Sequence, residues 1–274
     1  MKIKNKYSYT DGNQVWRIKL TETDKLFIET RNTEKKEAFF HCLHLNDGKP
    51  IFTQLQMEEK YWLGIETIYK DIILFHKFAK PDMPGHKGIF AFDINTQNVL
   101  WENEEYAFLF LLDKKIYAYQ EKFEGKKVST LSVETGELIE DLGNNPPNIN
   151  NLKDLADSQI DYTDYKFPES YYGTTTNPVN DELINSEIKN LSITGNIEFL
   201  HFVNFLIFNY HSQSKNKGIT NNLVVFDTLK KKIIFKEILN THLNAFAPDS
   251  FFIYKNLLIL IKEKNQVFVY DLIE

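Results

Sequence analysis

A hairpin motif recurs along this chain at intervals that limit what it can fold into. In its clearest copy, residues 91–101, an apolar strand ends at Asp93, a polar turn follows, and a second strand carries Val99 and Trp101. Related turns lie at Asp11, Asp47, Thr96, Thr135 and Lys230, and a partial copy ends at Glu274. Successive turns are 36, 49, 39, 95 and 44 residues apart. A period of about 40–50 residues is the length of a four-stranded β unit.

The strand pattern inside these units predicts an all-β fold: a single β-propeller of four-stranded antiparallel blades over residues 1–274. The 95-residue interval spans about two periods, which favours six blades with a degenerate blade at residues 144–190. A long insertion there would leave five blades. Within this region, residues 152–160 are expected to form one or two helical turns, and residues 162–172 and 183–188 are candidate strands.

The two ends of the chain predict how the ring closes. The last unit stops after residues 266–272 and lacks a fourth strand, whereas residues 14–20 have the fourth-strand pattern without a unit of their own. We expect these two segments to pair antiparallel and complete the last blade. Such pairing would remove an exposed sheet edge, which is otherwise an aggregation liability.

The clearest copy resembles the tryptophan-docking repeat of the quinoprotein-type β-propellers, a WD-like repeat with the pattern Ala-x-Asp-x-x-Thr-Gly-x-x-x-Trp. Ala91, Asp93, Thr96 and Trp101 match this pattern, and Gln97 replaces the glycine. The resemblance implies that the aromatic residue packs between neighbouring blades. Here that position is held by Trp16, Phe52, Trp101 and Phe235. In overall style the chain is also similar to uncharacterised propeller-like families known mainly from Bacteroidetes.

Quinone chemistry is not expected in spite of this resemblance. Quinoprotein dehydrogenases are larger, with eight blades in the usual case, and they often carry an adjacent pair of cysteines. This chain has one cysteine, Cys42, and too few units. The sequence therefore predicts no quinone and no other cofactor.

The charge balance argues against nucleic-acid and membrane partners. The net charge is −6, and the 32 basic residues include only two arginines, Arg17 and Arg31. Nucleic-acid binding usually needs a basic field, and binding to an anionic membrane needs one too. Lys230–Lys232 is the longest basic run, and its position between two apolar segments indicates a solvated hairpin turn.

The cysteine and the histidines predict no metal site and no catalytic residue. Cys42 lies in an apolar segment and is expected to be buried. His41 and His44 would point to opposite faces of a strand, so they cannot chelate one ion. The other histidines, without a ligand-type spacing, are His76, His86, His201, His211 and His242. Structural or solvent-facing roles are expected for all of them.

The N-terminal residues lack the apolar core of a secretory signal, and the apolar stretches at 199–208 and 251–261 are too short to span a bilayer as a helix. A cytoplasmic location is expected. The favoured function is a non-catalytic scaffold that binds an unidentified protein through long loops. These are residues 78–87 and the aromatic loop of Tyr162, Tyr165, Phe167, Tyr171 and Tyr172.

Three alternatives remain open at this point. The loop aromatics could instead pack the degenerate blade. The chain could bind a small molecule, or act as a hydrolase, at the central channel of the propeller. It could also be a sensor or structural module without a fixed ligand.

Overall fold

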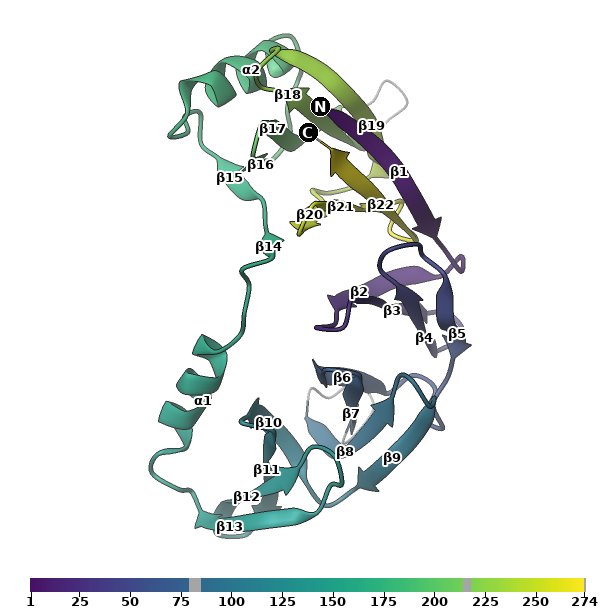
Figure 1. The fold of residues 1–274 in the computed structure, drawn as a ribbon, viewed down its shortest axis with the longest axis vertical. Coiled ribbons are helices and arrows are strands. Elements are labelled where there is room, and N and C mark those ends of the chain that lie inside the picture. The colour runs from purple at the N-terminus through teal and green to yellow at the C-terminus, as the bar shows by residue number, and fades with distance from the viewer. Residues whose placement is uncertain (79–84, 214–217, 274) are drawn as a thin grey trace. The chain divides into compact units, whose positions relative to one another are not determined.

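The structure is a computed structural model that describes residues 1–78, 85–213 and 218–273 (Figure 1). These residues form five antiparallel sheets and two helices. They group into two compact units, one of Trp16–Asp161 and one of Met1–Val15 with Tyr162–Glu274. The expected all-β fold of antiparallel sheets is confirmed, with four strands in three of the sheets and five in the other two. Closure into a single ring stays a prediction.

The Trp16–Asp161 unit holds three four-stranded sheets and one helix. Strand order follows chain order in each sheet. The first sheet is β2(Gln14–Leu20), β3(Lys25–Asn32), β4(Glu37–His44) and β5(Pro50–Leu55). The second is β6(Leu63–Tyr69), β7(Ile72–Phe78), β8(His86–Asp93) and β9(Asn98–Asn103). The third is β10(Ala107–Leu112), β11(Lys115–Lys122), β12(Gly125–Ser132) and β13(Leu138–Asn144), and α1(Ile149–Ser158) packs beside β10.

The other unit holds two five-stranded sheets and the second helix. One sheet has the order β15(Glu169–Tyr171), β16(Ile197–Phe202), β17(Phe205–Gln213), β18(Ile219–Asp227) and β19(Lys232–Leu243). Against it packs α2(Pro178–Ile188) through Leu183 and Ile184. The other sheet has the order β1(Lys2–Tyr9), β22(Gln266–Ile273), β21(Leu257–Lys262), β20(Phe251–Tyr254) and β14(Tyr165–Lys166).

The repeated hairpin is built by side chains that cap its turn. In the copy between β8 and β9, both carboxylate oxygens of Asp93 accept hydrogen bonds from the turn. The Asn95 N–H donates to Oδ1 at 3.1 Å, and the Thr96 hydroxyl donates to Oδ2 at 2.7 Å. Gln97 then adopts a left-handed backbone with φ of 57°. Asp and Thr therefore fix this turn by local hydrogen bonds, and the missing glycine is tolerated.

The N-terminal strand pairs with the C-terminal one, but it is a different strand from the one expected. Lys2 pairs with Ile273 and Tyr9 with Val267, which brings the two chain ends together in one sheet (Figure 1). Gln14–Leu20 instead begins its own sheet beside β3. The lysines of β1 make this strand hard to predict from sequence, because charged side chains are found both on exposed sheet edges and in solvated tails.

Residues 144–190 form an insertion rather than a sixth sheet. They contain both helices, and their two short strands, β14 and β15, lie at the edges of the sheets of β20 and β16. The expected strand at residues 183–188 is part of α2. Its start is fixed by Pro178 and by the side chain of Asn177, which accepts a hydrogen bond from the Val179 N–H. The described residues therefore match the five-blade alternative.

Candidate functional site: a histidine–glutamate cluster

Two irregularities in the β6–β9 sheet bring three chemistry-bearing side chains together. On β6, Glu66 is an extra residue, because Ile65 pairs with Phe75 and Thr67 with Leu74. On β8, one extra residue lies opposite His76, and Gly88 there has a φ of 73°. β-Bulges of this kind bend a strand and re-aim its side chains.

The re-aimed side chains are those of Glu66, His76 and His86, and we call them the Glu66–His76–His86 cluster. One carboxylate oxygen, Oε1 of Glu66, lies 2.9 Å from Nδ1 of His76 and 2.7 Å from Nδ1 of His86. The two imidazole rings stack face to face with centroids 3.5 Å apart. One potential ligand atom from each residue lies within 4.8 Å of the other two.

Burial differs across the cluster. His76 is only 3% exposed, and its two ring nitrogens have no partner with hydrogen-bond geometry among the described residues. The side chain of His86 is 37% exposed and hydrogen-bonds to Glu66. The half-buried ring of Phe78 lies nearly perpendicular to both imidazoles, at centroid distances of 5.1 and 5.8 Å. The cluster thus has a buried side at His76 and an open side at His86.

This cluster could not be predicted from the sequence, because no motif marks it. Glu66, His76 and His86 follow one another at intervals of ten positions on three successive strands, and the two bulges that align them leave no specific signal in a single sequence. The glycine at 88 was the one available hint, since a glycine inside a strand often marks a bulge.

The two buried histidines outside the cluster, His41 and His211, and the buried Cys42 have structural environments. The buried ring of His41 bonds to the Thr30 hydroxyl and to the Gln54 N–H, at 2.9 and 3.0 Å. His211 accepts from the Ala247 N–H at 3.2 Å, and burial lowers its pKa. Burial also raises the pKa of the Cys42 thiol to about 12, so this thiol stays protonated near neutral pH.

The four aromatic residues expected at docking positions differ in their contacts. Phe52 contacts Phe92 of the next sheet, with centroids 5.8 Å apart, and Phe235 contacts Tyr270 at 5.1 Å. Trp101 donates its indole N–H at 3.1 Å to the carbonyl of Val133, which lies in the β12–β13 turn of the next sheet. Trp16 is 51% exposed and stacks against a residue of its own sheet, the Arg31 guanidinium.

The expected interaction loop divides into exposed and buried parts. Tyr162, Tyr165 and Phe167 form one group of rings, with centroid distances of 5.6–6.1 Å, that extends to Phe252 and Tyr254 of β20. We call these five residues the 162–167 aromatic cluster. Tyr162 and Phe167 are 55% and 56% exposed.

The next two tyrosines differ from each other. Tyr172 is 85% exposed, whereas Tyr171 is buried against Phe199 and donates its hydroxyl to the Gly173 carbonyl at 2.8 Å. Tyr171 is therefore part of the hydrophobic core. In the other expected loop, residues 79–84 lie outside the described part of the chain.

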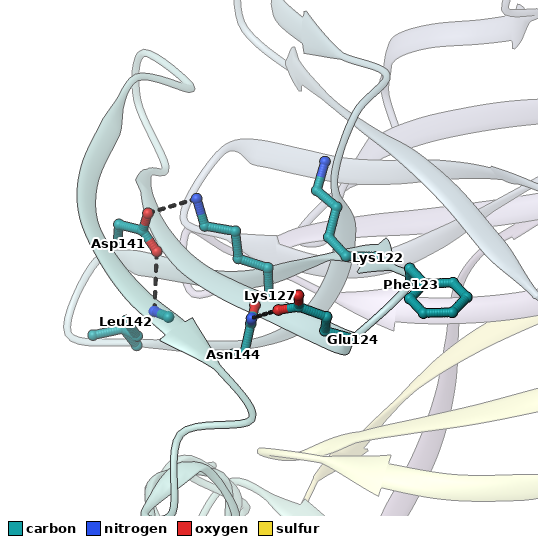
Figure 2. Close-up of a pocket in the computed structure, with 8 residues that line it drawn as sticks. Lys122, Phe123, Glu124, Lys127, Asp141, Leu142 and Asn144 are labelled. Atoms are coloured by element: carbon teal, nitrogen blue, oxygen red, sulfur yellow. Dashed lines mark hydrogen bonds and ion pairs between the residues drawn. The ribbon is translucent and has the colours of Figure 1, made fainter.

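A surface hollow of about 780 Å³ lies on β11–β13 (Figure 2). It is lined by Lys122, Phe123, Glu124, Lys127, Asp141, Leu142, Gly143 and Asn144. Four of its five charged or amide side chains already bind one another: Lys127 pairs with Asp141 at 2.7 Å, and Asn144 donates to Glu124 at 3.1 Å. The hollow therefore offers no convergent set of available polar groups.

Comparison with known proteins gives one family match. The family described as "Domain of unknown function (DUF4905)" matches residues 20–101, a segment that contains the whole Glu66–His76–His86 cluster. No curated protein matches the chain. Neither helix in the described part of the chain is long and apolar enough to cross a membrane.

Several solved structures show distant likeness to the chain. A bifunctional GH43-CE protein from Bacteroides eggerthii aligns over 97% of this chain with 9% identity and a TM-score of 0.29; the chain spans only 34% of that protein. An uncharacterized Listeria monocytogenes protein aligns over 96% of this chain and 95% of its own, with 11% identity and a TM-score of 0.35. Kluyveromyces lactis Hsv2 aligns over 96% of this chain and 76% of its own, with 11% identity and a TM-score of 0.28. Scores this low assign no function to the chain.

Proposed function

We propose that this chain is a non-catalytic scaffold of the cytoplasm that binds a protein partner through the 162–167 aromatic cluster. The observation that carries the proposal is the exposure of Tyr162 and Phe167, each more than half exposed beside packed rings. Large aromatic side chains are enriched among the residues that dominate protein–protein binding energy.

The packing of this cluster favours a role in binding. Tyr165 pairs with Tyr254 in the β14–β20 ladder, and its ring stacks with Phe167 at an interplanar angle of 12°. Phe167 also contacts Phe252 at 6.1 Å. The exposed rings are thus held by a sheet before any partner arrives, which reduces the conformational entropy lost on binding.

The chemistry of the cluster suggests what the partner carries. Tyrosine and phenylalanine faces bind apolar side chains and attract the cations of lysine and arginine. Beside the cluster, the Lys255 ammonium lies 5.2 Å from the ring centroid of Tyr254. The net charge of −6 also favours a basic partner over an acidic one. We therefore propose a partner segment with apolar anchors and flanking basic residues.

A paired pull-down from the host tests this proposal. The tagged full chain and a Tyr162→Ser, Phe167→Ser double variant are compared for the proteins they retain, with quantitative mass spectrometry. If both residues contribute as interface anchors, the double variant retains at least about tenfold less of the partner. Phe123→Ser is the matched control, because this phenylalanine is fully exposed on another hairpin.

Two results would contradict the proposal. One is equal retention by the double variant and the wild type; the other is an equal loss with the Phe123 control. Thermal unfolding of all three proteins separates binding from folding, and we expect their melting temperatures to agree, since the substituted rings are largely exposed.

A further inference from the structure

We propose that the Glu66–His76–His86 cluster binds one divalent transition-metal ion, of which Zn²⁺ is the best match. Two histidines and a glutamate converge from three adjacent strands, and one potential ligand atom of each lies within 4.8 Å of the other two. This inference is independent of partner binding at the 162–167 aromatic cluster.

The buried histidine is the strongest sign that something binds here. Buried polar side-chain atoms nearly always have a hydrogen-bond partner. His76 is 3% exposed, and neither ring nitrogen has such a partner among the described residues. Its Nδ1 faces Oε1 of Glu66 at 2.9 Å but without hydrogen-bond geometry. A metal ion placed between the two groups would satisfy both, because an imidazole nitrogen and a carboxylate oxygen are each lone-pair donors.

The distances are close to those that a metal ion requires. In a tetrahedral zinc site, ligands at 2.0–2.2 Å from the ion are about 3.3 Å from one another. The two nitrogen–oxygen distances, 2.9 and 2.7 Å, are a few tenths of an ångström shorter. Small side-chain rotations away from Glu66 would make room for the ion and would tilt the two stacked rings towards it. The partly exposed His86 is the residue best able to move.

The strand that carries Glu66 is fixed by both arginines of the chain. Arg17 donates to the Ile65 carbonyl at 2.6 Å, directly before the bulge. Arg31 donates to the Leu63 carbonyl at 2.6 Å. Groups that hold the ligands in place are as much part of a metal site as the ligands themselves.

A glycine provides space for the buried imidazole. Gly64 pairs with His76, and a Cβ atom at this position would lie 2.8 Å from both Cε1 and Nε2 of the ring. The backbone of Gly64 is not in the left-handed region, so an alanine there would conflict only with the His76 ring. Gly64→Ala should therefore displace the His76 imidazole without straining the backbone of β6.

The donor set selects a class of ion. Imidazole nitrogen with one carboxylate suits Zn²⁺ and Fe²⁺, whereas Ca²⁺ and Mg²⁺ prefer oxygen ligands and Cu⁺ prefers sulfur. Three protein ligands leave at least one coordination position for water or a small anion. That position would face solvent beside His86, whose side chain is 37% exposed.

Zn²⁺ binding to the metal-free full chain is measured by isothermal titration calorimetry, and the metal content after dialysis is measured by mass spectrometry. We expect one Zn²⁺ per wild-type chain. His86→Ala and the isosteric Glu66→Gln should each weaken binding by at least about 100-fold, and Gly64→Ala by about 10–100-fold. The exposed His44 is the matched control, and His44→Ala should bind as the wild type does.

The melting temperature is a second measurement, which distinguishes a loss of Zn²⁺ binding from a loss of folding. Zn²⁺ should raise the melting temperature of the wild type and of His44→Ala, and this shift should disappear in His86→Ala. The proposal is overturned if the wild type binds no Zn²⁺, if binding survives in His86→Ala, or if His44→Ala loses it equally. If the wild type binds no Zn²⁺, the cluster is only a contact between strands that includes the hydrogen bond of His86 with Glu66.

Discussion

The contact between Trp101 and Gly136 gives the sharpest test of how neighbouring sheets dock. Gly136 lies in the β12–β13 turn with a φ of 70°, and a Cβ atom there would lie 2.5 Å from Cδ2 of the Trp101 ring. Gly136→Ala should therefore destabilise the protein in two ways. The left-handed backbone costs about 1–2 kcal/mol for a residue with a Cβ, and the forced contact with the ring adds about 1–3 kcal/mol.

A double-mutant cycle separates these two costs. Trp101→Ala removes a half-buried ring and its hydrogen bond to Val133, and should lower the free energy of unfolding by about 3 kcal/mol. In that background Gly136→Ala meets no ring, so only the backbone cost of about 1–2 kcal/mol remains. The two substitutions should thus be coupled by about 1–3 kcal/mol.

Urea unfolding followed by far-ultraviolet circular dichroism measures all four proteins of the cycle. Trp101→Phe is the matched control, since it keeps an aromatic ring and loses the N–H donor, and it should cost about 1 kcal/mol. If Gly136→Ala costs the same in both backgrounds, the indole ring does not press on the turn and the docking argument is wrong. The four free energies can be compared if the slope of the free energy of unfolding against urea concentration is the same in all four proteins.

Three further predictions concern other parts of the chain. Tyr171→Ala should lower the free energy of unfolding, measured in urea, by about 3 kcal/mol, because its ring is buried. The exposed Tyr172 should change this free energy by no more than about 0.5 kcal/mol when replaced by alanine, and equal changes for the two variants would contradict the prediction. The Cys42 thiol should be inert to alkylating reagents until the protein unfolds. Because it ionises near pH 9 when unfolded and near 12 when folded, it stabilises the fold below pH 9. As pH rises from 9 towards 12, this contribution to the free energy of unfolding is lost by about 1.4 kcal/mol per pH unit. Cys42→Ala should remove this part of the pH dependence of the free energy of unfolding. Deletion of residues 1–9 should expose the β22 edge and lower the melting temperature by about 10 °C in calorimetry, and an unchanged melt would mean that β1 adds no stability.

The local architecture could be predicted from sequence because its signals are local. Strands such as Ile72–Phe78, Lys115–Lys122 and Phe251–Tyr254 contain apolar residues in alternation or in a row and adjoin polar turn residues. Alternating or continuous apolar residues and turn-forming side chains act within a few residues of each other. The aspartate-capped turn at Asp93 depends on its own neighbours in the same way.

Errors arose where the partner of a segment is distant in sequence. Residues 14–20 and residues 2–9 both have strand character, and only the ladder with β22 decides between them. Residues 183–188 are apolar enough for a strand, but the cap at Asn177 and the packing of Leu183 against the β15–β19 sheet make them helical. Apolar periodicity in short segments does not separate these alternatives.

By itself, the sequence determined most of the strands, the repeated hairpin, the four-stranded unit and the burial of Cys42. Tertiary structure alone decided how many sheets form, which end strand completes the last one, and that Glu66, His76 and His86 meet. The physical reason is that a side chain's environment depends on register, and one extra residue in a strand redirects it. The two bulges that flank β7 are such changes, and they turn three unremarkable residues into a candidate metal site.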